Sequence, residues 1–373
     1  MSAKTLDRSA YLSKNVGDFS DTLNINGVEF EKVEDLRYGT NPHQPAAFYK
    51  PLNVVSPVGD LEILKNGKSG LSQTNLEDIS YSMNIVKFFD EPACAVMKHV
   101  NPSGAAVQRG DESIKDVYVK ARDCDARAAF GSAICFNVEV DEEVAKEIMT
   151  TFVECVVAPS VSDAALAVFN DNVTYKLNSS IRIIKCGDLT KLPRYVGDEA
   201  AHVNSIKVLA DGSLVMAAPL LTNIRSVADL KPAEAENKRC GKQVSNVIAS
   251  ESQLSDLLAA WYINLNVRSN GVVIMKNGQT LAVGTGEQDR VGAVEQAISK
   301  FAAKYEGAED FACSVMSSDG FFPFPDAVEV AAEAGVQAII APAGSLRDAD
   351  VIKRANELGV ALVYAPERIF SHH

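Results

Sequence analysis

The chain has 373 residues, of which 47% are hydrophobic and 23% charged, and its formal net charge is −13. These values predict a globular protein with an ordinary apolar core and argue against a nucleic-acid backbone or an anionic membrane as the main partner. A few local cations would still be enough to hold a small anionic substrate. No apolar run approaches the ~18 residues of a membrane-spanning helix, and the N-terminus lacks the apolar segment of a signal peptide. We therefore expect a cytoplasmic protein.

Secondary-structure signals alternate along the chain. Residues 1–35 are polar and mixed, and are expected to form an N-terminal arm. Apolar periodicity and short apolar runs then predict, in order, a helix over 71–89, a strand over 93–100, a helix over 114–121, a strand over 133–138, a helix over 142–151, a strand over 155–157 and a helix over 163–170. This alternation predicts an α/β fold with a mostly parallel sheet.

The alternation of helix and strand signals stops between about 187 and 250, where Pro193, Pro219 and Pro232 interrupt the sequence pattern. We expect a linking region over 187–250, between a first α/β subdomain over 36–186 and a second over 251–373. The chain length is that of two or three domains.

The two subdomains share a faint repeat. Residues 156–160 and 339–345 are each an apolar run, then Ala-Pro and a small residue, and each precedes a helical segment. A Lys-Asn-Gly turn occurs at 65–67 and again at 276–278, near the start of each half. We interpret this as two halves of similar topology, and chance similarity between strand-turn-helix units is the alternative.

The seven cysteines are scattered and none forms a Cys-x-x-Cys pair. Buried free thiols in a reducing compartment are the simplest interpretation, and a zinc site is not expected.

A lysine and a histidine stand side by side where a buried strand ends. The apolar run 92–97 leads into Lys98 and His99, and Asn101-Pro102-Ser103-Gly104 predicts a turn directly afterwards. Strand ends are where α/β sheets usually bind ligands. An ammonium beside an imidazole favours the neutral ring, which can accept a proton. A surface Lys-His pair before a turn is the alternative.

Four further segments carry chemistry. Arg37 and Tyr38 lie beside a glycine turn and offer donors for a phosphate. Asn270 can donate and accept, which suits a carboxamide or a formyl group. The phenylalanine- and proline-rich run 317–326 predicts a rigid apolar wall that ends in a carboxylate, and the tail 367–373 predicts a docked segment. The alternatives are a solvated loop, a polar hairpin tip and ordinary core packing.

Together and in this order, these segments resemble the AICAR transformylase portion of the bifunctional purine-synthesis protein family. The motifs are RYGxNPHQ from Arg37, KHVNPSG from Lys98, a Ser-Asn pair followed by KNGQ, SSDGFFPFPD, IIAPAGS and an RIF…HH tail. The resemblance runs from about residue 36 to residue 373. It implies two cytidine-deaminase-like three-layer α/β/α subdomains with a small linking region, without the zinc signatures of true deaminases.

The resemblance also implies an activity, the transfer of a formyl group from 10-formyltetrahydrofolate to the 5-amino group of AICAR. His99 would accept the amine proton, Lys98 would keep His99 neutral and stabilise the oxyanion, and Asn270 would position the reactants. The implied substrate-binding residues are Arg37, Tyr38, Asn75, Gly131, Glu154 and Arg368. The implied folate-binding residues are Arg290, Val291, Phe321 and Asp326.

The family also implies a homodimer with composite active sites, and potassium near Asp319. Because only 36 residues precede Arg37, we expect a standalone transformylase without IMP cyclohydrolase activity. Two alternatives stay open. One is a catalytically silent nucleotide-binding regulator on the same fold, which the intact set of Lys98, His99 and Asn270 disfavours. The other is formyl transfer from a donor other than this folate.

Overall fold

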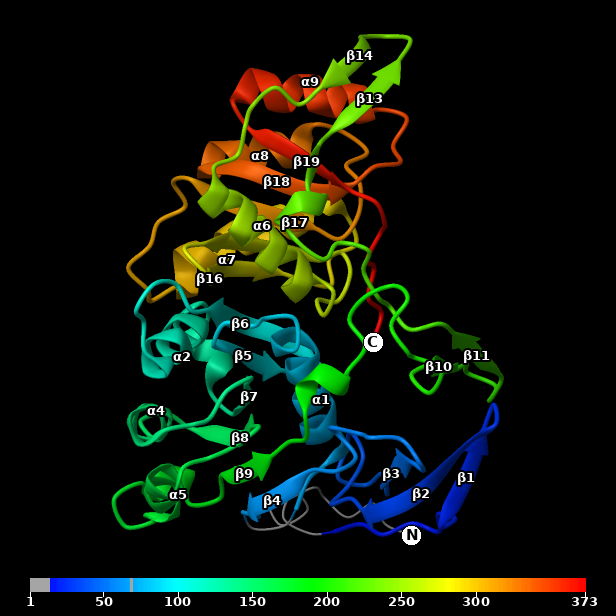
Figure 1. Cartoon of the computed structure of the whole chain (residues 1–373), viewed down its shortest axis with the longest axis vertical. Coiled ribbons are helices and arrows are strands. Elements are labelled where there is room, and N and C mark those ends of the chain that lie inside the picture. The colour runs from blue at the N-terminus through cyan, green and yellow to red at the C-terminus, as the bar shows by residue number, and fades with distance from the viewer. Residues whose placement is uncertain (1–13, 68–69) are drawn as a thin grey trace, which may run out of the picture. The chain divides into compact units, whose positions relative to one another are not determined.

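The computed structural model describes residues 14–67 and 70–373. Residues 1–13 of the expected arm lie outside this range. In the rest of the expected arm, residues 22–25 and 28–35 form strands, and the arm as a separate segment stays a prediction. β1 (Thr22–Ile25), β2 (Val28–Asp35) and β3 (Ala47–Pro51) make an antiparallel sheet in that order (Figure 1). Apolar and charged residues alternate from Val28 to Glu31, which is the period of a half-buried strand.

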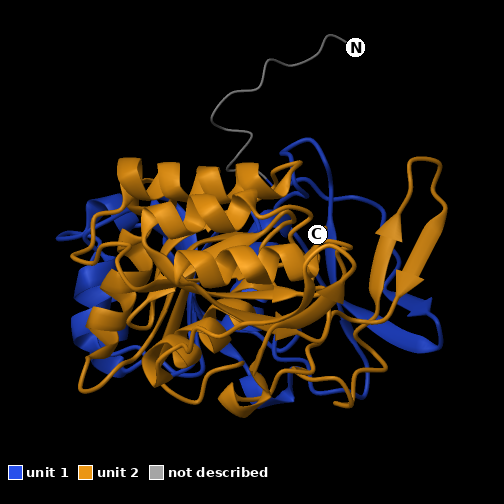
Figure 2. Ribbon diagram, turned by 90° about the horizontal axis from the view of Figure 1, so that it is seen from above, with its two compact units in different colours: residues 1–87, 97–100, 130–192 blue, residues 88–96, 101–129, 193–373 orange. Residues whose placement is uncertain are grey.

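The described chain divides into two compact units (Figure 2). Unit 1 comprises residues up to Lys87, Met97–Val100 and Phe130–Leu192, and unit 2 comprises Phe88–Val96, Asn101–Ala129 and Pro193–His373. The chain passes from unit 2 to unit 1 inside strand β5 (Ala93–Lys98). The expected boundaries at 36–186, 187–250 and 251–373 are a different division and stay a prediction.

Unit 1 contains four further strands, hydrogen-bonded in the order β7-β8-β9-β4. The first three of these strands are parallel, and β4 is antiparallel to β9. Helix α1 packs against β7 and β8. The elements are β4 (Glu62–Lys65), α1 (Gln73–Val86), β7 (Ser132–Phe136), α4 (Glu142–Ile148), β8 (Val153–Ala158), α5 (Asp163–Asn170) and β9 (Arg182–Lys185).

Unit 2 has a sheet with the order β12-β19-β18-β17-β15-β16-β6. The elements are β6 (Asn101–Val107), α2 (Ile114–Asp123), α3 (Ala126–Ala129), β12 (Lys231–Pro232), α6 (Glu251–Asn264), β15 (Val272–Lys276), β16 (Gln279–Gly284), α7 (Arg290–Lys304), β17 (Ser314–Ser318), α8 (Asp326–Ala334), β18 (Val336–Pro342), α9 (Asp348–Leu358) and β19 (Ala361–Ala365). Two hairpins, β10 (Ser205–Val208) with β11 (Leu214–Ala217) and β13 (Glu234–Asn237) with β14 (Gly241–Val244), complete it.

The core of unit 2 shows how helices cover the sheet. Val272 and Ile274 of β15 belong to a buried apolar cluster with residues of α7, α8 and α9. Successive strand residues face opposite sides, so the equally buried Val273 and Met275 face the other side, where α6 packs against β15 and β17. The predicted α/β fold class is confirmed.

The prediction of a mostly parallel sheet is wrong for unit 2. There only β17, β18 and β19 are mutually parallel, and β12, β15, β16 and β6 run antiparallel to their neighbours. The reason is local: Asn277 and Gly278 alone connect β15 to β16, and so short a loop can join only antiparallel strands.

The predicted helices and strands from residue 71 to residue 170 are all present, with ends shifted by a few residues. The repeated segments are also present, as β8 followed by α5 and β18 followed by α9. The two Lys-Asn-Gly turns, however, are not equivalent. The first follows β4 and precedes α1, whereas the second is the β15–β16 connection.

The turn expected at Asn101–Gly104 is also in the wrong place, because these residues open strand β6. Gly104 is required for packing. A Cβ at Gly104 would lie 2.1 Å from the carbonyl oxygen of Ala121, so only glycine lets α2 approach the strand this closely.

All seven cysteines are free. Cys313 is exposed, Cys240 is half-buried, and the others are buried. Over residues 14–67 and 70–373 there is no group of three or more His, Cys, Asp or Glu residues that could hold a metal ion. No helix in this part of the chain is long and apolar enough to cross a membrane.

Candidate active site

The lysine–histidine pair lies at a hairpin turn of unit 1. β5 ends at Lys98 and β6 begins at Asn101, so His99 and Val100 form the whole turn. Their φ angles are 54° and 61°, the pair of positive values that a two-residue type I′ turn requires. This is the irregular strand end that both side chains need if they are to serve one site. Lys98 is half-buried and His99 is exposed.

Valine is poorly suited to this turn. A β-branched residue at positive φ is an outlier, and holding a residue in such a conformation costs on the order of 1–3 kcal/mol. Backbone strain of this kind clusters at functional sites. The strained pair His99-Val100 therefore marks this turn as a candidate active site on geometric grounds alone.

Asp78 of α1 lies directly behind the turn. Its Oδ1 accepts a hydrogen bond of 2.7 Å from the backbone N–H of Val100, and the His99 backbone also donates to it. The side chain is buried, and this burial raises its pKa to about 6 despite those hydrogen bonds and the charge of Lys98. The sequence analysis missed Asp78, because nothing around residue 78 of the helix distinguishes it from a solvated carboxylate.

Lys98 is held on its other side by Gly131. The Lys98 ammonium donates to the Gly131 carbonyl oxygen at 2.5 Å. Gly131 has a φ of 75°, and a Cβ there would lie 3.0 Å from Lys98 Nζ and 3.3 Å from the ring of Phe152. Only glycine fits both the backbone and the space, so the lysine and this glycine, predicted separately, form one feature.

A second group of predicted residues is joined by hydrogen bonds. Asn75 is the third residue of α1 and completes a capping box with Ser72. Its Oδ1 accepts from Arg37 Nη2 at 3.4 Å, and its Nδ2 donates to Glu154 Oε2 at 2.9 Å. The guanidinium of Arg37 lies 4.6 Å from the ring centroid of Tyr38. Four predicted substrate residues therefore converge at the start of α1.

Arg182 adds a second buried guanidinium. Arg37 and Arg182 are 8% and 5% exposed. Burial lowers the pKa of Arg37, and the positive charge of Arg182 lowers it further, while Glu154 opposes the shift. Two buried arginines with one carboxylate make a local surplus of positive charge, which suits an anion. Arg182 was missed because it is one arginine in an ordinary strand, Arg182–Lys185.

In unit 2, Asn270 is fixed by the loop after β16. Its Nδ2 donates to the carbonyl oxygen of Glu287 at 2.8 Å, and its backbone N–H donates to the same oxygen at 3.1 Å. The side-chain oxygen Oδ1 is the remaining acceptor of the amide. Asn270 is half-buried, and its hydrogen bond to Glu287 holds the amide in one orientation.

Arg290 and Asp319 form a buried ion pair beside this loop. Asp319 Oδ2 also accepts from the Gly271 backbone at 2.8 Å. Both carboxylate oxygens therefore have donors, and one of these donors is a cation. This is not the donor set of a potassium ligand, so no step is assigned to potassium, and its binding stays a prediction.

The predicted folate side is partly exposed. Phe321 is 37% exposed and Phe324 50%, and Asp326 is exposed at the first position of α8. The guanidinium of Arg347 lies 5.2 Å from the centroid of the Phe324 ring. Val291 is half-buried and packs on the unit 2 core. Arg290 is the member of this group that makes the buried ion pair with Asp319.

The C-terminal tail is docked, as predicted. Ile369 is buried, and its N–H donates to the carbonyl oxygen of Asp319. Ser371 accepts from the backbone of Ser269 at 2.9 Å. Arg368 is exposed and lies 4.3 Å from the Phe370 ring centroid. Arg368 belongs to unit 2, whereas Arg37 and Tyr38 belong to unit 1, so a phosphate grip by all three stays a prediction.

The fold and the site define an α/β protein with a strained lysine–histidine turn and a buried pair of arginines, Arg37 and Arg182. Comparison with known proteins agrees with this description. The profile of the AICARFT/IMPCHase bienzyme family matches residues 6–300. The chain belongs to this family.

Several curated proteins are similar to this chain along most of its length. The bifunctional purine biosynthesis protein PurH of Oceanobacillus iheyensis is 37% identical over 92% of this chain and 60% of its own length. The proteins of the same name from Bacillus cytotoxicus and Acetivibrio thermocellus are 36% and 38% identical, over 98% and 97% of this chain and 64% and 63% of their own lengths. The chain thus spans about three fifths of these relatives.

Proposed function

We propose that the chain transfers a formyl group from 10-formyltetrahydrofolate to the 5-amino group of AICAR, giving FAICAR and tetrahydrofolate in purine biosynthesis. The observation that carries this proposal is the Lys98-His99 turn, strained and placed in the same unit as the buried Arg37 and Arg182. Unit 1 thus contains both buried cations that suit an anionic ribotide and a histidine that can accept a proton. The family membership and the motifs quoted above support the choice of reaction.

The amine of the ribotide is a weak nucleophile, because the ring and the carboxamide withdraw its lone pair. As its nitrogen attacks the formyl carbon, a C–N bond forms, and His99 takes the departing amine proton. Lys98 stabilises the negative charge on the formyl oxygen. The bond between the formyl carbon and the folate nitrogen then breaks, and that nitrogen receives a proton.

Different predicted site residues bind the different parts of the two substrates. Arg37, Tyr38 and Arg368 bind the phosphate, while Asn75, Gly131 and Glu154 line the nucleotide pocket. Asn270 orients the formyl group with its fixed amide. Arg290, Val291, Phe321 and Asp326 bind the folate.

The protein acts as a homodimer with composite sites in this proposal. The β10–β11 hairpin supports it, because all eight of its strand residues are exposed and most are apolar. An isolated two-stranded hairpin is marginally stable in water, and exposed apolar patches mark contact surfaces. A cytoplasmic location fits the free cysteines.

The decisive experiment follows the absorbance of the folate during turnover of purified protein with AICAR and 10-formyltetrahydrofolate, with and without potassium. FAICAR formation supports the proposal, and AICAR binding without turnover would favour the nucleotide-binding regulator. A turnover that needs a different formyl donor would correct the co-substrate.

We further propose that these 373 residues do not cyclise FAICAR to IMP, because the motifs from residue 36 to residue 373 resemble the transformylase portion. Product should accumulate to a partial equilibrium until a cyclohydrolase is added. Chromatography of the reaction mixture tests this, and IMP formed by the purified chain alone would contradict it.

A further inference from the structure

The two units each contain a helix of the same design. Helices α1 and α6 are both 14 residues long, and each starts after a serine, Ser72 or Ser250, that forms a capping box. Six residues after each serine stands an aspartate, Asp78 or Asp256, with 5% and 3% exposure. Aspartate is rarely buried in this way without a specific set of partners.

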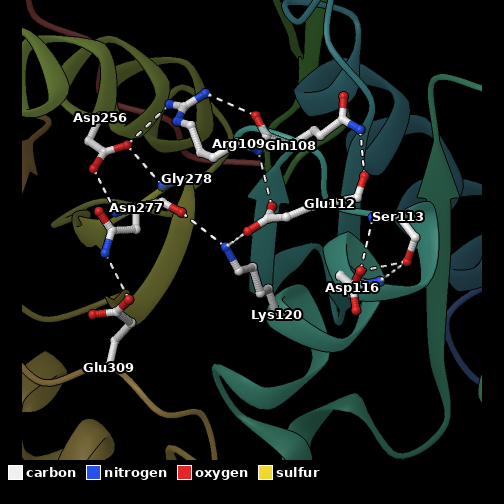
Figure 3. Close-up of polar contacts among 10 residues, drawn as sticks. All are labelled: Gln108, Arg109, Glu112, Ser113, Asp116, Lys120, Asp256, Asn277, Gly278 and Glu309. Atoms are coloured by element: carbon white, nitrogen blue, oxygen red, sulfur yellow. Dashed lines mark hydrogen bonds and ion pairs between the residues drawn. The ribbon is translucent and has the colours of Figure 1, made fainter.

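Each aspartate accepts hydrogen bonds from a hairpin turn, and the two turns lie equally far along the chain from their serine caps. In unit 2, Asp256 accepts from the backbone N–H groups of Asn277 and Gly278 at 2.7 and 3.0 Å, and Arg109 pairs with it at 3.1 Å (Figure 3). The φ angles of this turn are 50° and 75°. Asp256 thus binds both amides of a left-handed two-residue turn.

In unit 1, Asp78 binds the turn of His99 and Val100 in the corresponding way. Both turns follow a Met-Lys pair, and both begin 27 residues after the serine cap. Their φ angles agree within about 15°. The equivalent of the Asn277-Gly278 turn is therefore His99-Val100, which sequence similarity around Lys-Asn-Gly had concealed.

We call the hydrogen bonds from an aspartate carboxylate to the backbone N–H groups of its turn a clamp. The two turns differ in how far they depend on it. Asn-Gly is the preferred sequence for a type I′ turn, so Asn277 and Gly278 adopt their conformation readily. Valine at positive φ does not. The first turn keeps this conformation against its own sequence preference, with Asp78 bonded to its backbone amides.

We propose that Asp78 is a positioning residue, whose carboxylate holds the His99-Val100 backbone in the left-handed turn and so sets the direction of the Lys98 and His99 side chains. The use of that direction in formyl transfer rests on the proposed function, whereas the clamp itself does not. Asp78 acts through the backbone of the turn and is assigned no proton transfer.

The charges around Asp78 agree with this role. Lys98 attracts the carboxylate, whereas burial and the charge of Glu154 act against its ionisation, and the thiol of Cys155 is close enough for its own pKa to respond to Asp78. The backbone N–H groups of His99 and Val100 compensate the buried carboxylate of Asp78, whereas Asp256 is compensated by two backbone N–H groups and by the guanidinium of Arg109.

The test uses four variants of the full chain: Asp78→Ala, Val100→Gly, the double variant, and Asp78→Asn. We expect Asp78→Ala to lower kcat by about 10–100-fold, because a small misplacement of catalytic groups has effects of that order, with little change in the KM for AICAR. Glycine adopts the turn without help, so Val100→Gly should restore most of kcat in the Asp78→Ala background. Asp78→Asn keeps an acceptor and should stay close to wild type.

Asp256→Ala is the matched control. It removes the same clamp from the unit 2 turn and should lower the unfolding midpoint without lowering kcat. Asp78→Ala should lower the midpoint more in the wild-type background than in the Val100→Gly background. If Asp78→Ala lowered the unfolding midpoint equally in the two backgrounds, Asp78 would not clamp the turn. If the double variant folded but kept the low kcat of Asp78→Ala, Asp78 would not position the catalytic side chains.

These outcomes separate the two proposals. If the wild-type protein transfers no formyl group, the proposed function fails, while the unfolding midpoints still decide whether Asp78 clamps the turn. If Asp78→Ala folds only together with Val100→Gly, the clamp is supported directly.

Discussion

Different neighbours fix the backbone of His99 and the side chain of the adjacent Lys98. Asp78 bonds the amides of its turn, while Gly131 fixes the adjacent Lys98 through a carbonyl oxygen. The imidazole itself is exposed at the end of the turn. A change of the His99 side chain therefore removes a reactive group and leaves the supports of the site in place.

We predict that His99→Ala lowers kcat by about 10²-fold or more, the usual range for a general base, with AICAR binding little changed. Steady-state kinetics and calorimetric titration with AICAR measure the two quantities. His202→Ala is the control, since His202 is a half-buried histidine that is not among the predicted site residues. Near-normal turnover of His99→Ala would remove this residue from the mechanism.

Asp78 also predicts how stability depends on pH. Its folded pKa of about 6 lies above the ~3.9 of an unfolded aspartate, so the folded protein binds the extra proton between these values. Stability should therefore fall as pH rises from about 4 to 6, by on the order of 3 kcal/mol at most. Asp78→Asn should flatten this part of the profile. Unfolding midpoints between pH 4 and 7 measure it, and parallel profiles would contradict it.

At the scale of elements, glycines decide how closely a helix approaches a strand. A Cβ at Gly104 would lie 2.1 Å from the Ala121 carbonyl oxygen of α2, and a Cβ at Gly284 would lie 2.1 Å from the Ala293 carbonyl oxygen of α7. Each glycine follows a hairpin turn in its own half of the chain. The close approach of strand and helix is thus repeated together with the hairpins.

We predict that Gly104→Ala and Gly284→Ala each destabilise the fold by about 1–3 kcal/mol, the usual effect of overpacking. Gly39→Ala is the control, because its nearest neighbour is the movable Gln73 side chain at 3.2 Å. Denaturant unfolding compares the three. Equal stability of all three variants would show that the helices can shift freely.

Much of this element structure follows from the sequence. The helices and strands between residues 71 and 170 were predictable, because apolar periodicity is a local signal. The turn at His99-Val100 was not predictable, because its residues disfavour the conformation and a distant aspartate contributes to holding it. The mixed sheet of unit 2 was missed for the related reason that strand direction depends on the connection.

Some residues of the candidate site were likewise predictable from the sequence, and others were not. Arg37, Asn75 and Glu154 were placed by motif resemblance, and the structure joins them by hydrogen bonds. Arg182 and Asp78 lie in an ordinary strand and an ordinary helix, and only their burial beside the motif residues reveals them. A buried charge is a property of the fold, so no short segment of sequence reports it.

At the scale of the whole molecule, the β10–β11 hairpin presents an apolar surface. Val208, Leu214 and Val215 are 70%, 63% and 47% exposed. Covering such a surface would contribute about 25 cal/mol for each Å² of apolar area. The proposed homodimer accounts for it if the partner copy packs there.

We predict that Val208→Glu combined with Val215→Glu shifts the protein from dimer toward monomer. Sedimentation equilibrium measures the change, and the composite-site proposal adds that turnover should fall with the dimer fraction. Ser205→Glu is the control for the effect of one such charge, since it puts a glutamate on a polar position of β10. A wild-type protein that is monomeric and fully active would contradict both the dimer and the composite site.

The distribution of thiols makes the protein suited to site-specific labelling. Burial raises the pKa of the Cys124 and Cys155 thiols to about 12, so almost none of either is reactive thiolate at neutral pH. Cys313, just before β17, is exposed. A maleimide dye should therefore attach first at Cys313 without any engineered cysteine. Energy transfer between dyes on donor- and acceptor-labelled copies of the chain would then test whether the proposed homodimer forms and exchanges its subunits.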